Sequence, residues 1–355
     1  MSVGETARRA FTAAVVIGGV VVVALALWKL RILLALIFFA FIIAAAMRPG
    51  IEALRRRGVP RGFGIALHYL GLFGLVGLGL WQLVPRATTQ ISNALEDLPT
   101  SSSELEAEAE GSTGIRRQIL EGLQQRLEDV PSGGELFEQG LEVGLIGFEI
   151  AIGIFFVLAT AAYWIFERDR AVDLVASLMP RPRRKVMRDT WTLIDLKLGA
   201  YVRGQLILIV LVGTILSMTF WAIGLPYWIL LGAFAGVVEI IPVIGPITAG
   251  AVAIGAGLTV SWQVALGAGL AVLIVRLIED YLIIPRVLGE AVGLSPLLVL
   301  FSVTGVALLF GEFAVLLAIP IAAVLSTLVD VIVRGKDPSD QDVPAVIFSA
   351  KEGET

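Results

Sequence analysis

The sequence predicts an all-α integral membrane protein with about six full transmembrane helices and two broken or re-entrant helical hairpins. Hydrophobic residues make up 57% of the 355-residue chain and charged residues only 16%, whereas soluble domains are only about half apolar. The apolar residues fall in eight blocks, and most blocks approach or exceed the roughly 20 residues that span a bilayer as a helix. An outer-membrane barrel would show alternating segments of about ten residues instead.

The first three blocks, 11–28, 32–47 and 62–84, predict transmembrane helices within an N-terminal region, 1–85. Because no small-residue cleavage site accompanies the first block, we expect a retained span rather than a signal peptide. The connection 48–61 carries five arginines and one glutamate. By the positive-inside rule, this excess of basic residues places the connection on the cytoplasmic side.

The polar insert 86–140 is predicted to lie on the opposite, extracytoplasmic side. It contains eleven acidic and four basic residues, and a single crossing at 62–84 leads to it from the cytoplasmic connection. Within it, Ile115, Ile119 and two leucines recur every four positions, which predicts a short amphipathic helix. That helix either lies near the outer membrane surface or packs on a neighbouring subunit.

A fourth span, 141–166, leads into an amphipathic and basic linker, 167–202, predicted to be cytoplasmic. The stretch 167–203 holds nine lysines and arginines against five acidic residues. Its RPRRK cluster at 181–185 suits anionic lipid headgroups. No nucleic-acid partner is predicted, because a few basic residues beside a span usually orient the protein in the bilayer.

The C-terminal region 203–333 contains a helix interrupted by proline. Its apolar block 227–260 divides at Pro242 to Pro246, which leaves arms of about 14 residues that rise about 21 Å each, less than the hydrocarbon thickness of about 30 Å. Proline lacks a backbone donor and clashes with the preceding turn. The block therefore either kinks as one long helix or turns back as a re-entrant hairpin.

The last apolar block, 294–333, repeats this arrangement with an interruption at Gly311 and Glu312. Each broken block follows a full-length span, 204–223 or 262–284. Two such units of opposite orientation form an inverted repeat, a common plan of secondary transporters whose binding site lies where the breaks meet. Helix ends inside a membrane are tolerated where they are buried in protein or line a wet cavity, and their free backbone groups can bind a polar solute.

Four carboxylates in this region are candidates for an ionic site: Glu239, Glu279, Asp280 and Glu312. Arg276 lies three residues before Glu279 and four before Asp280, so it can pair with either on one helical face. Ionisable groups inside a membrane are costly and therefore suggest function. The structural alternatives are an ion pair with a nearby arginine, a position at the interface, or a helix N-cap formed by Glu312.

Two polar residues, Arg203 and Gln205, begin the span 204–223 and either contact the solute or anchor the helix at the interface. The glycines and prolines near the breaks would shape the hairpins. The predicted substrate- or ion-binding residues are Glu239, Pro242, Gly245, Pro246, Glu279, Asp280, Pro285, Gly289, Pro296, Gly311, Glu312, Arg203 and Gln205.

Several of these residues stand in motifs by which the C-terminal half resembles the autoinducer-2 exporter family of bacterial membrane proteins. The motifs are RGQ at 203–205, EIIPVIGP at 239–246, IEDYLIIPRVLGEAVGLSP at 278–296, and a late GE followed by Pro320. The resemblance implies a homo-oligomeric, multi-pass protein of the bacterial inner membrane. Both chain termini are then expected in the cytoplasm, with 334–355 as a disordered tail.

The leading hypothesis is a secondary transporter that exports a small polar solute, such as an autoinducer-2-like quorum signal. Residues 1–166 would form a scaffold, and the unit 203–333 would move past it in alternating access. A Na⁺(Li⁺)/H⁺ antiporter, a structural protein of the envelope or of sporulation, and a passive channel are alternatives. No enzymatic motif is present. The absence of cysteine and the single histidine, His68, argue against disulfides and a His-based metal site, and no cofactor is predicted.

Overall fold

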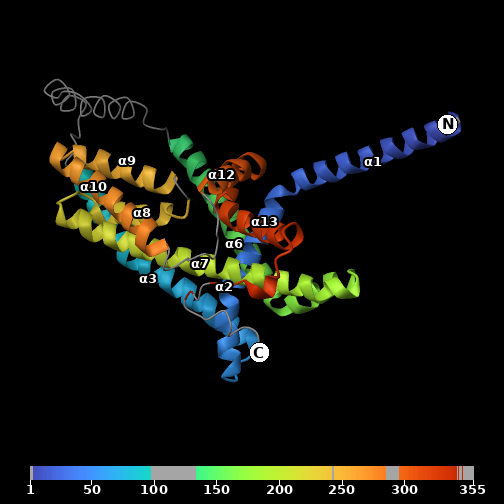
Figure 1. Ribbon diagram of the computed structural model, residues 1–355. Coiled ribbons are helices and arrows are strands. Elements are labelled where there is room, and N and C mark those ends of the chain that lie inside the picture. Colours follow the sequence, from blue (N-terminus) through green and yellow to red (C-terminus); the bar gives the residue numbers. More distant parts are fainter. Residues whose placement is uncertain are drawn as a thin grey trace.

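The described part of the chain is helical throughout. The computed structural model describes residues 3–96, 133–241, 244–284 and 296–341, together with Val343 and Val346. These residues form helices and contain no strand (Figure 1), which confirms the predicted all-α class. The predicted amphipathic helix of the polar insert lies outside the described residues, as do Pro242, Pro285 and Gly289.

Six of the described helices contain segments long and apolar enough to cross a membrane. Five of these segments overlap the spans predicted from the sequence, and the sixth is Ala314–Ile332. Four of the helices belong to the N-terminal half: α1 Val3–Lys29, α2 Arg31–Arg56, α3 Arg61–Glu96 and α6 Gly133–Ser177. The apolar segment of α1 has no buried residue, and α1 projects away from the other helices (Figure 1).

Helix α2 connects the N-terminal half to the C-terminal half. Its Ala40 and Ala44 are buried against Val157 and Ala161 of α6. On another face, Ile42 packs with residues of α7 and of the segment before α13, Ala318–Ile332. Without a hydrophobic driving force in lipid, close packing of small side chains is the main source of helix association. The alanines of α2 therefore explain its central position.

Helix α7, Arg181–Ala222, has 42 residues and is about 63 Å long, roughly twice the hydrocarbon thickness. Its N-terminal half must therefore extend beyond the bilayer. Arg184 donates from Nε to the Met179 carbonyl (3.0 Å) and from Nη2 to the Ser177 carbonyl (3.0 Å). One residue of the predicted lipid-binding RPRRK cluster thus satisfies the free carbonyls at the C-terminus of α6.

The first broken block forms a hairpin of two short helices, α8 Trp228–Val238 and α9 Ile244–Leu258. They have 11 and 15 residues, or about 17 and 23 Å, so neither spans the bilayer. The two helices pack on each other, and a helix pair with so short a connection is antiparallel. Close packing depends on glycine, because a Cβ on Gly245 would collide with the Val238 carbonyl and one on Gly236 with α7.

The second broken block also folds back on itself, but less symmetrically. Helix α12, Pro296–Phe310, is followed by Gly311. The φ of Gly311 is +93°, a left-handed backbone conformation that favours glycine. A 3₁₀ turn, η2 Glu312–Leu317, then leads into α13. Val303 and Val306 of α12 pack against Ala314 and Ala318. Unlike either arm of the first hairpin, the second arm is long enough to cross a membrane.

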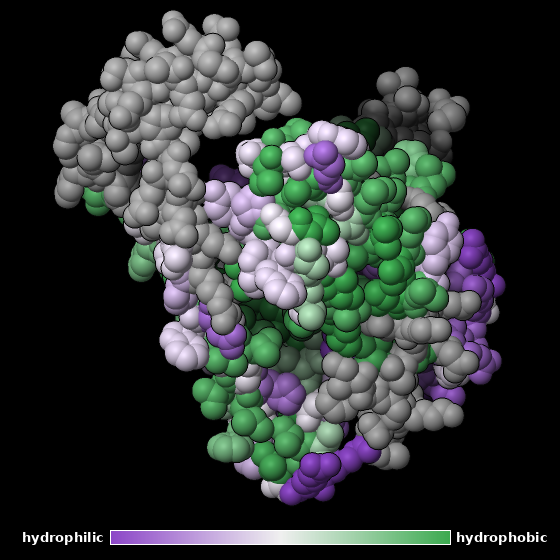
Figure 2. All heavy atoms as spheres, turned by 90° about the vertical axis from the view of Figure 1, so that its left-hand side faces the viewer, coloured by the Kyte–Doolittle hydropathy of each residue, from purple (hydrophilic) through white to green (hydrophobic). Residues whose placement is uncertain are grey.

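Between the hairpins, helix α10 runs from Trp262 to Ile278 and continues as a π-helical turn, Glu279–Ile283. Apart from Gln263 near the start of α10, the exposed side chains of α9 and α10 are apolar, and Figure 2 shows a broad hydrophobic surface on the side formed by α8, α9 and α10. Such a surface is expected to contact lipid. Its exposed residues include Val252, Ile254, Leu258, Leu266, Leu270 and Leu273.

Residues after α13 return to α7. Lys197 donates to the Gln341 side chain (3.0 Å) and to the Thr327 hydroxyl (3.2 Å). Val346 is buried against Ala200. Within the short turn Pro338–Asp340, hydrogen bonds from the Ser339 hydroxyl and amide hold the pKa of Asp337 below its usual value. Part of the predicted tail is thus packed on the bundle.

The hairpin topology can be tested by thiol labelling, because the natural chain has no cysteine. If α8 and α9 form a re-entrant hairpin, Ala222→Cys and Thr259→Cys will react with a membrane-impermeant thiol reagent from one side of the membrane. Ser339→Cys, beyond α13, will react only from the other side. Labelling of the first two positions from opposite sides would mean that this block crosses the membrane.

Candidate functional site

An ionic cluster lies at the first break, centred on Arg276 of α10. Its Nη1 atom contacts Glu239 Oε1 at 2.9 Å and Glu279 Oε2 at 3.3 Å. Its Nη2 atom contacts Asp280 Oδ1 at 2.9 Å. The side chains of Glu239 and Glu279 are 7% and 2% exposed, whereas that of Asp280 is 42% exposed. Two buried carboxyl groups therefore share one guanidinium nitrogen.

Local structure explains why these groups meet. Arg276 pairs with the residues three and four positions further on, as the helical spacing predicts. The pairing occurs where α10 becomes a π-helical turn at Glu279, a distortion found frequently at functional sites. Glu239 directly follows α8, and its backbone carbonyl accepts a hydrogen bond from Gln205 Nε2 at 3.1 Å. Gln205 thereby satisfies one of the carbonyls left free by the helix end.

The charges of the cluster do not balance when every group is ionised. Three carboxylates and one guanidinium carry a net charge of −2. Uncompensated charge is costly to bury, because a low-dielectric environment cannot replace the solvation by water. The two buried carboxyl groups are therefore suited to hold a proton or a monovalent cation.

A small cavity adjoins the cluster. Its volume is about 10 Å³, enough for about one water molecule. Apart from Glu239, Arg276 and Glu279, the lining is apolar. The site is therefore closed to any larger solute in this conformation. The other lining residues are Val212, Leu216, Ala235, Pro246, Ala249, Val272 and Val275.

The second break lies near the first. Ile241, within the first break, packs against the apolar cluster of the second hairpin that contains Val303 and Ala314. This contact agrees with the expectation that the two breaks meet. Gly311 forms the second break, and Glu312 begins the 3₁₀ turn after it.

Arg203 is not part of the cluster. Its guanidinium is buried and donates from Nε to the Val346 carbonyl (2.9 Å) and from Nη1 to the Ala46 carbonyl (3.1 Å). Arg203 and Gln205 of the RGQ motif were both predicted to contact the solute. Gln205 contacts the first break through the Glu239 carbonyl, whereas Arg203 contacts the C-terminal segment through the Val346 carbonyl. Of the predicted hairpin residues, Pro246 lines the cavity, Gly245 packs on α8, and Pro296 begins α12.

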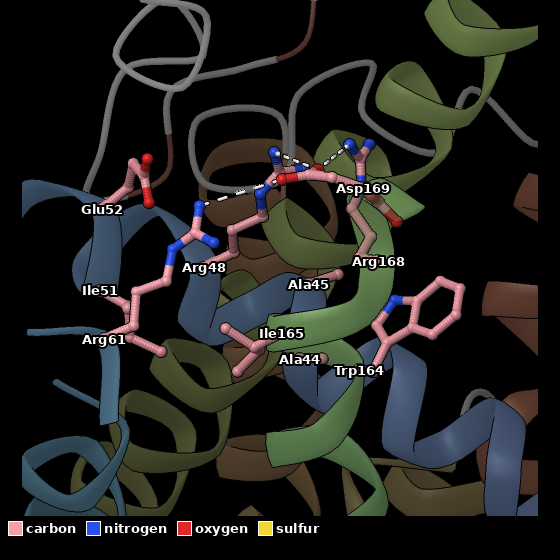
Figure 3. A pocket seen from close by; sticks show the side chains of 11 residues that line it. Ala44, Ala45, Arg48, Ile51, Glu52, Arg61, Trp164, Ile165, Arg168 and Asp169 are labelled. Atoms are coloured by element: carbon pink, nitrogen blue, oxygen red, sulfur yellow. Dashed lines mark hydrogen bonds and ion pairs between the residues drawn. The ribbon is translucent and has the colours of Figure 1, made fainter. Parts of the chain in front are cut away.

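A second ionic cluster was not predicted from the sequence. Arg168, near the end of the apolar part of α6, contacts Asp195 of α7 at 2.7 Å and Asp169 at 3.1 Å, and Arg48 of α2 contacts Asp195 at 3.5 Å (Figure 3). In the sequence these residues belong to polar connections, whose basic residues indicate the orientation of the protein in the bilayer. The only signal in the sequence is that both connections contain arginines and that the second also contains aspartates. The spacing of these residues does not indicate which of them pair, because their helices are far apart in the chain.

Spanning helices, two broken hairpins and a buried ionic cluster together define a polytopic membrane protein with the plan of secondary transporters. The family model described as "AI-2E family transporter" matches residues 17–334, and the chain belongs to this family. The resemblance inferred from the motifs is thereby confirmed.

Three curated relatives match most of the chain. "Putative transport protein YrrI" of Bacillus subtilis (strain 168) is 27% identical over 308 residues, which cover 82% of this chain and 84% of that protein. "Putative transport protein YueF" of the same organism is 26% identical, with coverages of 85% and 86%. "Putative permease PerM" of Escherichia coli (strain K12) is 23% identical, with coverages of 84% and 86%.

Substitution of Arg276 tests the cluster as a buried ionic unit. Arg276→Gln leaves two buried carboxyl groups without their cation, and such changes cost about 3–5 kcal/mol. Asp280→Asn removes an exposed contact to the same guanidinium and should cost at most about 1 kcal/mol. Equilibrium unfolding in detergent micelles measures both changes. Equal losses for the two variants would contradict the arrangement.

Truncation tests the contact between the tail and Arg203. Deletion of residues 346–355 removes the Val346 carbonyl, keeps Gln341, and leaves a buried guanidinium donor unsatisfied, which should cost about 1–3 kcal/mol. Deletion of residues 349–355 keeps Val346 and serves as the matched control. Thermal unfolding midpoints should fall for the longer deletion only, and identical midpoints would show that the contact contributes no stability.

Proposed function

We propose that the protein is a proton-linked secondary transporter of a small polar solute, with Glu239, Glu279 and Arg276 at the centre of its binding site. The observation that supports this proposal is the sharing of one guanidinium nitrogen by two buried carboxyl groups. Asp280 is 42% exposed and therefore solvated, so Arg276 can balance one of the two buried carboxylates, and the other is neutral when it holds a proton. Loss or gain of that proton changes the charge of the site by one unit and links solute binding to proton movement.

The geometry suggests how such a cycle would work. A carboxylate accepts hydrogen bonds from solute hydroxyl groups and a guanidinium donates to solute oxygens, so the cluster offers both kinds of partner. Because the cavity admits about one water molecule, the solute requires an opened conformation. The breaks beside Gly245 and Gly311 are the places where the helices can move without disrupting a long hydrogen-bonded span. In this proposal, the unit 203–333 moves against the scaffold formed by residues 1–166.

An autoinducer-2-like quorum signal is the first solute to test, with export as the direction. The family model's description and the hydroxyl-binding chemistry of the cluster support this choice. The proposal includes a homo-oligomer in the bacterial inner membrane with both termini in the cytoplasm. The basic composition of the connections 48–61 and 167–203 supports that orientation.

Cation/proton exchange is the second candidate, and the size of the cavity favours it. A volume of about 10 Å³ accommodates one water or one small monovalent cation, and the excess of carboxylates would attract the cation. In this function, Na⁺ or Li⁺ and a proton would compete for Glu239 and Glu279. No larger solute would be required.

Flux in proteoliposomes distinguishes the candidates. Labelled autoinducer-2 is measured under imposed proton or sodium gradients in wild-type protein, Glu239→Gln and Glu279→Gln. Solute transport is supported if the flux is saturable and falls at least about tenfold in both variants. A tenfold fall corresponds to a rise of about 1.4 kcal/mol in the activation free energy of transport. Glu167→Gln, which changes an exposed glutamate paired with Arg170, is the matched control and should retain flux.

Ion exchange is measured in the same vesicles without autoinducer-2. Sodium- or lithium-dependent proton movement that disappears in Glu239→Gln and Glu279→Gln would support the antiporter instead. If folded wild-type protein shows no solute flux and no ion exchange, the result contradicts transport. It favours a structural role in the envelope or in sporulation.

A further inference from the structure

A second charged site lies where α2, α3, α6 and α7 meet, apart from the cluster at the first break; Arg61 begins α3, and Arg48 and Arg168 stand within their helices next to the predicted apolar blocks. Three guanidinium groups, those of Arg48, Arg61 and Arg168, line a cavity of about 20 Å³ (Figure 3), which we call the arginine crevice. Such a volume admits one water-sized group. Its walls are partly apolar and consist of Ala44, Ala45, Ile51, Trp164 and Ile165.

Arg168 forms the buried base of the crevice. Its Nε contacts Asp195 at 2.7 Å, its Nη1 contacts Asp169 at 3.1 Å, and its Nη2 donates to the Thr192 hydroxyl at 3.2 Å. The contact to Asp195 has the length of a charge-assisted hydrogen bond, and the other two lie within ordinary hydrogen-bond distance. Arg168 therefore has well-defined partners, and it holds both aspartates in place.

Arg48 and Arg61 are engaged much less closely. Arg48 lies 3.5 Å from Asp195 and 3.9 Å from Asp169, and Arg61 lies 3.9 Å from Asp169, whereas close pairs have distances of about 2.7–2.9 Å. The side chains of Arg48 and Arg61 are 34% and 30% exposed. Each guanidinium carries five N–H donors, so both have donors available for a further acceptor.

The crevice and the adjoining Arg55 together carry an excess of positive charge. The charged residues that line the crevice are Arg48, Arg61 and Arg168 against Glu52, Asp169 and Asp195, which balance. Arg55, outside the lining, contacts Glu52 at 3.0 Å, and with Arg55 counted the group carries a net charge of +1. An anion that accepts hydrogen bonds from two guanidinium groups would complete the site.

We propose that the arginine crevice binds the phosphate group of an anionic membrane phospholipid. Phosphate oxygens match the planar, forked donors of arginine, and one of them fits a space of about 20 Å³ while the rest of the headgroup stays outside. The crevice lies where the apolar segments Arg31–Arg56 and Arg61–Gln82 adjoin, at the level expected for headgroups. Phe63 and Phe166, beside Arg61 and close to Arg168 in sequence, are exposed and can contact the acyl chains.

A bound phosphate would link α2 to α3 through Arg48 and Arg61. Since Asp169 and Asp195 belong to α6 and α7, the lipid would complete a polar contact among all four helices at one membrane surface. The same chemistry would admit a soluble phosphate ester, which lacks contacts to the apolar surface. These two sources of phosphate give different results in the experiment below.

Lipid binding is measured on the purified full chain in detergent by native mass spectrometry, with phosphatidylglycerol and phosphatidylcholine as probes. We expect phosphatidylglycerol to bind about tenfold more tightly, a difference of about 1.4 kcal/mol. Arg61→Gln should abolish most of this preference. Arg57→Gln removes the same charge from the same connection at an exposed position outside the crevice and should preserve it.

Inorganic phosphate and glycerol 3-phosphate test the soluble source. If millimolar concentrations displace phosphatidylglycerol and raise the thermal midpoint of the wild type as strongly as the lipid does, a soluble phosphate ester is the ligand and the lipid proposal is wrong. If Arg57→Gln and Arg61→Gln lose the preference for phosphatidylglycerol equally, general charge attraction causes it and the arginine crevice is not the binding site. Arg61→Lys keeps the charge without the forked donors, so partial retention of binding in a folded Arg61→Lys protein supports the site even if Arg61→Gln fails to fold.

Discussion

A helix that ends inside a membrane must have partners for its terminal backbone groups, because lipid offers none. The architecture of the C-terminal half depends on how this requirement is met at the first break. Gln205 of α7 donates to the Glu239 carbonyl, and Gly245 lets the start of α9 lie against the end of α8. Once α8 and α9 end at this depth, the Glu239 side chain is buried, and Arg276 of α10 supplies its counter-charge.

The ionic cluster follows from the same constraint. A carboxyl group placed at a buried helix end requires a cation, and the cation that reaches it also contacts Glu279 and Asp280. One guanidinium then serves more acidic groups than it can neutralise. The resulting capacity to hold a proton or a cation connects the helix break to transport, since a site whose charge changes by one unit can favour different conformations.

Polar contacts beside the predicted apolar blocks complement the apolar packing within the bilayer. Alanines of α2 hold the two halves of the chain together at close range. Beyond them, Arg168 joins α6 to α7, and Arg203 joins α7 to α2 and to the tail. Each of these arginines is buried and accepts no hydrogen bond, so each requires acceptors from other elements. Both therefore constrain how the segments outside the spans are placed.

The sequence by itself determined the helical class, the approximate spans, the broken blocks and the pairing of Arg276 with Glu279 and Asp280. All of these depend on residues close in the chain, through hydropathy, proline geometry and helical spacing. Only the tertiary structure decided that Glu239 shares Arg276, that Gln205 caps the break while Arg203 binds the tail, and that Arg48, Arg168 and Asp195 form a second cluster. Those contacts join residues up to 147 positions apart, and hydropathy and periodicity carry no information about which distant helix faces meet.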